Sequence, residues 1–411
     1  MCVVMVKRAA EAEVLAALED TPVVLIHGPR QCGKSTLAQT VGKQIGASYV
    51  TLDDPTPRSL ASTEPESLLQ GYPGPLIIDE VQRAPELFLA LKASVDRNRT
   101  PGRFLLTGSA NVLALPKIAD SLAGRLAIID LLPFSQAEAE GSGGRFIDSL
   151  FDGAHLTGPA VAPDELAERL VKGGFPEPSR RPTQSRRDAW FADYVRTLLE
   201  RDVRDLSNIE GLAQMPRLLR LLAARSGEAL NVIDLAGETR IPNTSLHRYL
   251  DLLKALFLIH QVPAWSIDAP VRLTKTPKSL LVDSGLLCHL REVSAPKIAQ
   301  DQDLRGNLLK SFVALELRKL SSFSDARPVL HHLRTVKRLE VDFVLERRGG
   351  EVVGVQVKAG STVSPHDADG LEYLRELAGH RFVRGVVLYE GGETQPLGRS
   401  LAAVPIAALW A

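Results

Sequence analysis

The sequence predicts an α/β protein: a parallel sheet near the amino end, a helical middle, and a second α/β region at the carboxyl end. Short apolar runs that end in glycine or acidic residues, as at 22–27 and 76–80, are typical of buried parallel strands. Helical periodicity dominates residues 163–256. Two β-type runs joined by a glycine turn return at 338–358.

Composition limits the classes of protein to consider. A chain of 411 residues is long enough for about three domains. Lys plus Arg and Asp plus Glu both number 49, so any surface for nucleic acid must be a local patch. The cysteines Cys2, Cys32 and Cys288 are far apart, which predicts no disulfide and a reducing cytoplasm. No uncharged apolar run reaches ~18 residues, so no membrane segment is expected.

Residues 28–35 read Gly-Pro-Arg-Gln-Cys-Gly-Lys-Ser and fit the pattern G-x-x-x-x-G-K-S between a strand and a helix. Backbone N–H groups of such a loop surround a β-phosphate at a helix N-terminus. Lys34 would reach the β- and γ-phosphates, and the Ser35 hydroxyl would ligate Mg²⁺. The predicted ATP contacts are Gly28, Pro29, Arg30, Gln31, Cys32, Gly33, Lys34, Ser35 and Thr36.

A second apolar strand, Leu76-Ile-Ile-Asp-Glu80, ends in two carboxylates, which is a Walker B pattern. Asp79 would hold the Mg²⁺ shell, and Glu80 would orient or deprotonate the attacking water. A strand tip with solvated acids is the alternative, and the phosphate-loop motif in the same chain argues against it. Together the two motifs predict an enzyme that hydrolyses ATP with Mg²⁺.

Polar groups follow a third strand, in the stretch Arg103-Phe-Leu-Leu-Thr-Gly-Ser109. Because carboxyl ends of parallel strands face the ligand, Thr107 or Ser109 is expected to sense the γ-phosphate, and only one of them. Arg125 precedes the strand 126–131. It is either a charge at a helix C-terminus or an arginine finger that completes a neighbouring subunit's site.

The chain resembles a known family. Its motifs are the phosphate loop, LIIDEVQRAPEL, FLLTGSAN, SLAGR followed by LLPFSQAE, then GGFPEP and LERDV. These resemble the bacterial and archaeal AAA+ ATPases whose C-terminal part is the domain of unknown function 4143, over residues 15 to 405. The resemblance implies an AAA+ core with a small helical lid, and a homo-oligomeric ring such as a hexamer. Arg125 occupies the position that matches the family's arginine finger in trans.

Basic residues gather in the middle of the chain. The run Ser179–Arg187 contains four arginines, which could bind phosphates of nucleic acid or simply form a solvated loop. The four are Arg180, Arg181, Arg186 and Arg187.

Residues 214–263 predict a helix, a turn, a second and third helix, and a strand, the order of a winged helix-turn-helix. The N-terminal residues of its last helix would face a DNA groove. They are Asn243, Thr244, Ser245, His247 and Arg248. The alternative is that the module packs on the ATPase or on a neighbouring protein.

At the carboxyl end, a helix over 304–320 precedes the two β-type runs. Glu316, Asp342, Gln356 and Lys358 match the layout of the restriction-endonuclease-like PD-(D/E)xK nucleases, in which acids bind Mg²⁺ and the lysine acts on the nucleophile. Gln356 departs from that pattern because an acid usually stands there. Otherwise Asp342 and Lys358 are ordinary strand-end charges.

The expected domains are an AAA+ ATPase core over 1–140, a helical lid over 141–208, a winged helix-turn-helix over 209–270 and a nuclease-like domain over 271–411. This organisation predicts an ATP-driven machine that acts on duplex or branched DNA. A regulatory ATPase with nucleotide-switched protein contacts and an ATP-gated metal-dependent nuclease are the alternatives.

Overall fold

The computed structural model describes residues 6–109, 122–202, 212–268, 272, 275–335 and 339–411. The chain forms two compact units. The first is Met1–Pro133 with Ala255–Leu258, and the second is Phe134–Lys254 with Ile259–Ala411. The expected division of the second unit into lid, winged helix and nuclease-like domain stays a prediction, because its residues cluster as one body. Among the described residues, no helix has the length and apolar character needed to span a membrane.

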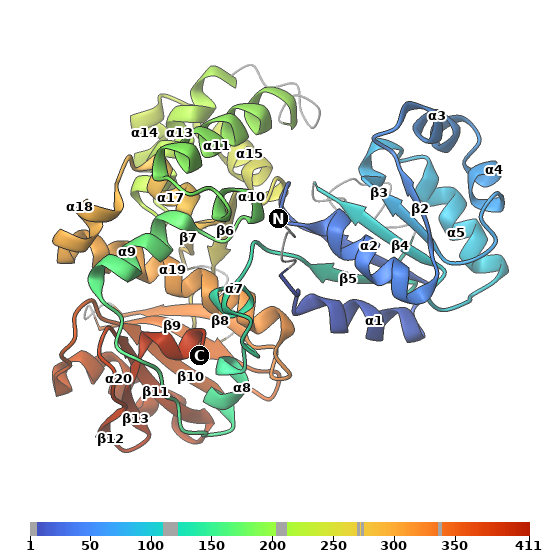
Figure 1. Ribbon diagram of the computed structural model, residues 1–411. Helices are drawn as coiled ribbons and strands as arrows, with labels where there is room; N and C mark the ends of the chain where they lie inside the picture. Colours follow the sequence, from blue (N-terminus) through green and yellow to red (C-terminus); the bar gives the residue numbers. More distant parts are fainter. Residues whose placement is uncertain (1–5, 110–121, 203–211, 269–271, 273–274, 336–338) are drawn as a thin grey trace. The chain divides into compact units, whose positions relative to one another are not determined.

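The first unit is built on a five-stranded sheet in the order β2-β3-β4-β1-β5, and every neighbouring pair is parallel. The sheet and its helices are visible in Figure 1. The strands are β1 (Val23–His27), β2 (Ser48–Thr51), β3 (Leu76–Asp79), β4 (Phe104–Gly108) and β5 (Leu126–Asp130). Because β4 lies between β1 and β3, the carboxyl ends of these three strands are neighbours.

Strand residues alternate between two cores, one on each face of this sheet. Val24 and Ile26 of β1 pack with the helices α1 (Ala10–Asp20) and α2 (Lys34–Ile45), whereas Val23 and Leu25 pack toward the opposite helices. Those opposite helices are α3 (Pro55–Thr63), α4 (Pro65–Gln70) and α5 (Leu87–Arg97). Burial on both faces explains why the strands read as continuous apolar runs.

The proline content of the stretch 55–65 predicts a loop, and this prediction is wrong, because the stretch forms α3 and the start of α4. Pro55 and Pro65 each stand in the first turn of a helix, where the missing N–H has no helical partner to lose. The leucines Leu68 and Leu69 are buried and fix α4 against the sheet.

The second unit begins with helices, of which α9 and α11 were expected. They are α7 (Gln136–Glu140), α8 (Phe146–Phe151), α9 (Pro163–Lys172), α10 (Pro176–Ser179) and α11 (Gln184–Thr197). A π-helical turn, Leu198–Asp202, follows α11. The helical periodicity predicts that this helix continues to residue 206, and residues 203–206 lie outside the described residues.

The elements of the expected winged helix occur in the predicted order. They are α13 (Met215–Ala224), α14 (Val232–Thr239), α15 (Asn243–Ala255) and the antiparallel strands β6 (Ile259–Val262) and β7 (Lys278–Leu281). Arg240, between α14 and α15, has a left-handed backbone conformation that makes the turn. The helices α17 (Ser284–Leu290) and α18 (Ala295–Gln300) follow β7.

A mixed six-stranded sheet in the order β12-β13-β11-β10-β9-β8 closes the chain. Its strands are β8 (Val329–Arg334), β9 (Glu340–Glu346), β10 (Val352–Val357), β11 (Phe382–Tyr389), β12 (Gln395–Gly398) and β13 (Leu401–Pro405). The helices α19 (Gln302–Phe323) and α20 (Asp369–Ala378) accompany it, and α19 agrees with the helix predicted over 304–320. The fold is α/β in both units, as the sequence indicates.

Candidate active site

The backbone of the loop between β1 and α2 requires glycine at positions 28 and 33. A Cβ on Gly28 would lie 2.0 Å from the carbonyl oxygen of Leu131, so only glycine fits there. Gly33 has a φ of 101°, a left-handed conformation that glycine adopts readily, and α2 begins directly after it. The N-terminal amides of α2 are therefore available to an anion at the loop.

Lys34 is 4% exposed, and its ammonium group lies at the loop. The Nζ atom donates to the carbonyl oxygens of Gly28 at 3.1 Å and of Pro29 at 2.8 Å. The backbone of the loop thus holds a cation close to the amides that open α2, and both features attract phosphate oxygens.

Asp79, at the carboxyl end of β3, is surrounded by neutral hydroxyl donors. Ser35 Oγ donates to its two carboxylate oxygens at 2.8 and 3.1 Å. Thr107 Oγ1 donates to Oδ1 at 2.5 Å, and the Tyr49 hydroxyl donates to Oδ2 at 2.8 Å. A hydroxyl beside a carboxylate is the oxygen set that Mg²⁺ prefers, so these residues fit the ion.

Tyr49 extends this set from the neighbouring strand β2. Burial and the hydrogen bond to Asp79 raise the pKa of the Tyr49 phenol to about 12. The phenol therefore stays protonated and donates to Asp79 throughout the physiological pH range.

Glu80 follows Asp79 with a left-handed backbone at φ 58°. Its N–H donates to Thr107 Oγ1 at 3.1 Å, and its carboxylate Oε2 accepts from Ser109 Oγ at 3.0 Å. Thr107 is fully buried and uses its hydroxyl on Asp79 and on the Glu80 backbone. Ser109 instead contacts the carboxylate itself. Which of the two senses a γ-phosphate stays a prediction.

Three neighbours of the site were not predicted from the sequence. Tyr49 contacts Asp79, Gln82 donates to the Glu80 carboxylate, and Arg8 donates to the carbonyls of Cys32 at 2.7 Å and Leu132 at 2.6 Å. No motif marks Tyr49 or Arg8, since they come from other elements. Gln82 lies inside the quoted Walker B stretch, and only the turn after β3 shows where it points.

Arg125 lies away from the phosphate loop of its own unit. It precedes β5, which runs parallel to β1, whereas the loop follows the opposite, carboxyl end of β1. Its Nε and Nη2 atoms bond one carboxylate oxygen of Asp96, each at 2.6 Å, and Nη1 donates to Ala123 O at 3.1 Å. The arginine-finger role stays a prediction, in which Arg125 acts on the site of a neighbouring subunit.

The four arginines of the 179–187 run divide into two kinds. Arg187 is buried and pairs with Glu168 at 3.2 Å, and Arg181 pairs with Glu177 at 3.3 Å. The side chains of Arg180 and Arg186 are exposed. Only part of the run is therefore presented to solvent.

The start of α15 has the expected two-sided character. Asn243, Thr244, His247 and Arg248 are exposed and Ser245 is half-buried. The opposite face of the helix is buried, with Leu246, Tyr249, Leu250 and Leu253 in the core.

In the C-terminal sheet, Asp342 on β9 is fully buried, and its partners include a lysine. Lys310 Nζ of α19 lies 2.8 Å from Oδ1, and the Val357 N–H donates to Oδ2 at 2.9 Å. The carbonyl of the Gln356 side chain accepts from the Asp342 N–H at 3.2 Å. An ammonium group thus lies on the carboxylate where a nuclease would place a divalent ion.

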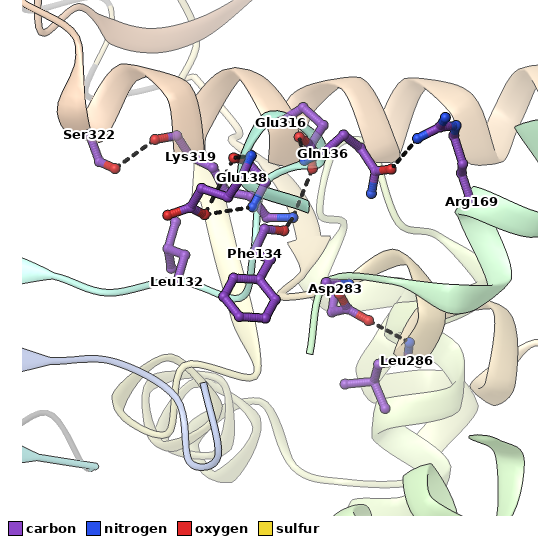
Figure 2. A network of polar contacts seen from close by, with 12 residues as sticks. Leu132, Phe134, Gln136, Glu138, Arg169, Asp283, Leu286, Glu316, Lys319 and Ser322 are labelled. Carbon is purple, nitrogen blue, oxygen red and sulfur yellow. Dashed lines mark hydrogen bonds and ion pairs between the residues drawn. The ribbon is translucent and has the colours of Figure 1, made fainter. Parts of the chain in front are cut away.

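Glu316 is engaged in a different network, which Figure 2 shows. It accepts from the Gln136 N–H at 2.7 Å and pairs with Lys319 at 2.8 Å, and Lys319 also donates to Phe134 O at 2.9 Å. Lys310, six positions earlier on the same helix, points about 120° away around the axis. Glu316 therefore faces α7, whereas Lys310 faces Asp342.

The expected nuclease set is not assembled. Lys358 pairs with Asp367 at 2.5 Å. Among the described residues, no three His, Cys, Asp or Glu side chains come together as a metal site. These residues do not fit a metal ion, because the carboxylates already have cationic or N–H partners.

Family models place three domains along the chain. Residues 20–140 match an AAA domain, 163–297 match the domain of unknown function 8612, and 305–409 match the domain of unknown function 4143. The parallel sheet and the phosphate loop give the first unit the fold of a P-loop ATPase, in agreement with the AAA-domain match. The chain carries a C-terminal domain of the 4143 family, as the sequence resemblance implied.

Similar proteins occur in several organisms. An uncharacterized protein of Mycobacterium tuberculosis is 29% identical over 405 residues, which are 98% of this chain and 84% of that protein. One of Haemophilus influenzae is 23% identical over 317 residues, or 73% of this chain and 69% of that protein. Among solved structures, the Walker-type ATPase of Pyrococcus abyssi has 18% identity, covers 70% of this chain and 96% of its own, and gives a TM-score of 0.45. The RuvB Holliday junction branch migration motor of Thermotoga maritima has 18% identity, covers 65% and 94%, and gives 0.32.

Proposed function

We propose that this chain is a Mg²⁺-dependent ATP hydrolase whose nucleotide cycle drives work on duplex or branched DNA. Hydrolysis is supported by four residues that lie together at one edge of the sheet, namely Lys34, Ser35, Asp79 and Glu80. The buried Thr107 hydroxyl bonds both the Asp79 carboxylate and the Glu80 N–H. Mg²⁺ would neutralise phosphate charge during transfer.

Each residue has a defined part in that reaction. The loop amides and the Lys34 ammonium hold the β- and γ-phosphates. Ser35 and Asp79 supply adjacent oxygens for the ion. Glu80 holds the attacking water and accepts its proton, because its carboxylate lies beside that edge, where Ser109 donates to it.

Arg125 is proposed to act on the site of a neighbouring copy in a homo-oligomer. Substituting Arg125 with alanine should lower the ATP turnover of the assembled protein at least tenfold while leaving nucleotide binding intact. Arg97→Ala is a matched control, since Arg97 is a well-exposed side chain of the same unit whose pairing with Glu66 is loose, at 3.7 Å. A rate per subunit that stays constant as protein concentration rises through assembly would contradict the role in trans.

DNA contact is proposed for the exposed start of α15 and for Arg180 and Arg186. Support comes from the helix order α13, α14, α15 followed by a two-stranded ribbon, with one face of α15 buried and the other polar and exposed. The proposal includes the interpretation of these elements as a winged helix.

Binding can be measured by fluorescence anisotropy on duplex, single-stranded and four-way junction DNA, with and without ATP. At ~50 mM salt, where phosphate contacts are strongest, Arg186→Ala combined with His247→Ala should weaken binding by about tenfold or more. Arg97→Ala should not change it. Absence of binding by the wild type to all three DNAs at this salt would exclude the DNA role.

A regulatory ATPase is the second candidate. The balance of 49 basic and 49 acidic residues favours it, as do the ion pairs that engage Arg181 and Arg187. In this case, substitutions at Arg186 and His247 would leave cellular activity intact while Lys34→Ala abolishes it.

An ATP-gated nuclease is a third candidate, and the Lys310–Asp342 pair argues against it. It requires Asp342→Ala to remove Mg²⁺-dependent cleavage without changing ATP turnover. Wild-type protein that never nicks DNA under any nucleotide condition would eliminate it.

A further inference from the structure

Two polar side chains, Ser109 and Gln82, meet at the Glu80 carboxylate. Ser109 Oγ donates to Oε2 at 3.0 Å, and the Gln82 side-chain amide donates to the same oxygen. The amide also donates to Ser109 Oγ at 2.9 Å. The side chains of Glu80, Gln82 and Ser109 form a closed hydrogen-bonded triangle.

The turn after β3 explains how Gln82 reaches back. The left-handed backbone of Glu80 opens the short 3₁₀ turn Val81–Arg83, and Val81 is fully buried. Arg83 Nε lies 2.6 Å from an Asp53 carboxylate oxygen, which ties the end of the turn to the segment after β2. Gln82 therefore projects from a turn that is anchored on both sides.

The orientation of the Gln82 amide is fixed by its neighbours. Its NH₂ group faces the Glu80 carboxylate, and a reversed amide would place oxygen against oxygen. The Oε1 atom is buried and has no hydrogen-bond partner within the described residues. A buried acceptor without a donor costs stability, so fold stability does not explain this arrangement.

We infer that Gln82 is a positioning residue for ATP hydrolysis, an inference that rests on the proposed ATPase function. A general base must hold its carboxylate within hydrogen-bond reach of the water, and the Glu80 side chain has several rotatable bonds. One donor, Ser109, leaves the carboxylate free to pivot about that bond. A second donor from a different segment, Gln82, fixes its plane.

Replacing Gln82 with alanine tests the inference. The kcat for ATP should fall about tenfold, because the base is then misplaced, while the KM and the affinity for a non-hydrolysable ATP analogue stay unchanged. Gln82→Met should behave in the same way, since it keeps the volume and removes the donor. Gln44→Ala is the matched control: Gln44 is exposed on α2 and donates to the Glu11 carboxylate at 2.8 Å, the same pairing outside the site.

A second measurement separates positioning from packing. In a Glu80→Gln background, Gln82→Ala should cause no further loss of kcat, because Gln82 acts only through the Glu80 carboxylate. A further tenfold loss in that background would overturn the inference, as would wild-type kcat in the single variant. If the wild type itself fails to hydrolyse ATP, the proposed function fails first, and this outcome is distinct from both.

Discussion

Two buried acids, Asp79 in the first unit and Asp342 in the second, lie on strands of their sheets and have opposite surroundings. Asp79 accepts hydrogen bonds from the hydroxyls of Ser35, Tyr49 and Thr107. Asp342 lies 2.8 Å from the Lys310 ammonium. Neutral donors leave the charge of Asp79 for a metal ion to balance, whereas Lys310 already balances that of Asp342.

The charge state of Lys310 supports this contrast. Burial by itself lowers the pKa of the ammonium, but the negative charge of Asp342 outweighs burial and raises the pKa above its ordinary value. Lys310 therefore stays charged at neutral pH. A buried acid therefore does not define a metal site by itself, because the charge of its neighbours decides whether a metal ion is needed to balance it.

The largest expected effect comes from the charge at the first site. Glu80→Gln should lower ATP turnover by about 100-fold or more, because the amide cannot accept the proton, while ATP binding persists. Steady-state hydrolysis and analogue binding measure the two quantities. Glu86→Gln, at an exposed position six residues on, is the control. Turnover that survives Glu80→Gln would remove Glu80 from the chemistry.

Lowering the pH should lower the stability of the second unit. Burial, with nearby Lys278, lowers the pKa of His332 on β8 from 6.5 to about 4. The unfolded chain therefore binds this proton near pH 6.5 and the folded chain only near pH 4. The free energy of unfolding should fall as the pH is lowered through that window, by at most about 3 kcal/mol from this group.

Urea unfolding at pH 7 and pH 5 measures this loss. His332→Gln, which keeps a side-chain donor for the Thr276 carbonyl at 3.3 Å, should lose less stability between the two pH values than the wild type. His366→Gln is the control, because its side chain is 91% exposed. Equal losses in all three proteins would show that His332 is not responsible.

Breaking the Lys310–Asp342 pair should lower the free energy of unfolding by less than the protonation of His332 does. Lys310→Met leaves the fully buried Asp342 without its cation, and the free energy of unfolding should fall by about 2 kcal/mol. Adding Asp342→Asn should recover most of the loss. Lys254→Met breaks an exposed pair with Asp251 and should cost about 0.5 kcal/mol or less.

A substitution of Lys310 can also reverse the charge beside Asp342. Lys310→Glu places a second carboxylate beside Asp342, so Mn²⁺ should raise the melting temperature of this variant in the absence of nucleotide. The wild type should show no such rise. A Mn²⁺-dependent rise in the wild type that disappears in Asp342→Asn would show that Asp342 binds a metal ion despite Lys310.

The smallest effect is expected at Tyr49. Tyr49→Phe removes one neutral donor from Asp79, and Ser35 and Thr107 remain. The kcat/KM for ATP should fall by about fivefold, or ~1 kcal/mol. Steady-state kinetics at saturating Mg²⁺ measure it. A loss as large as that of Glu80→Gln would mean that Tyr49 does more than orient Asp79.

The sequence predicted the first site better than the second for a physical reason. Lys34 and Ser35 follow Gly33 at once, and Asp79 ends an apolar strand, so local spacing places these groups correctly. The sequence also placed Thr107 at the site, because the carboxyl ends of parallel strands meet at one edge of the sheet. The donors Tyr49 and Gln82 depend on a neighbouring strand and on a turn, and spacing does not reveal either.

For the second site, the sequence order of helix, strand and hairpin was right and the helix face was wrong. The long helix α19 is buried almost all round, so its apolar pattern does not indicate which face meets β9. The nuclease layout places an acid of this helix, Glu316, beside Asp342, but Lys310 is the residue that reaches Asp342.

By itself, the sequence determined the phosphate loop, the strand that ends in Asp79 and Glu80, and the α/β class of both ends, because each depends on residues close together in the chain. Tertiary structure alone decided which neighbours surround the acids. It placed hydroxyls and the Gln82 amide around the first pair and an ammonium on Asp342. The difference arises from contacts between distant elements, whose side-chain directions no local pattern fixes.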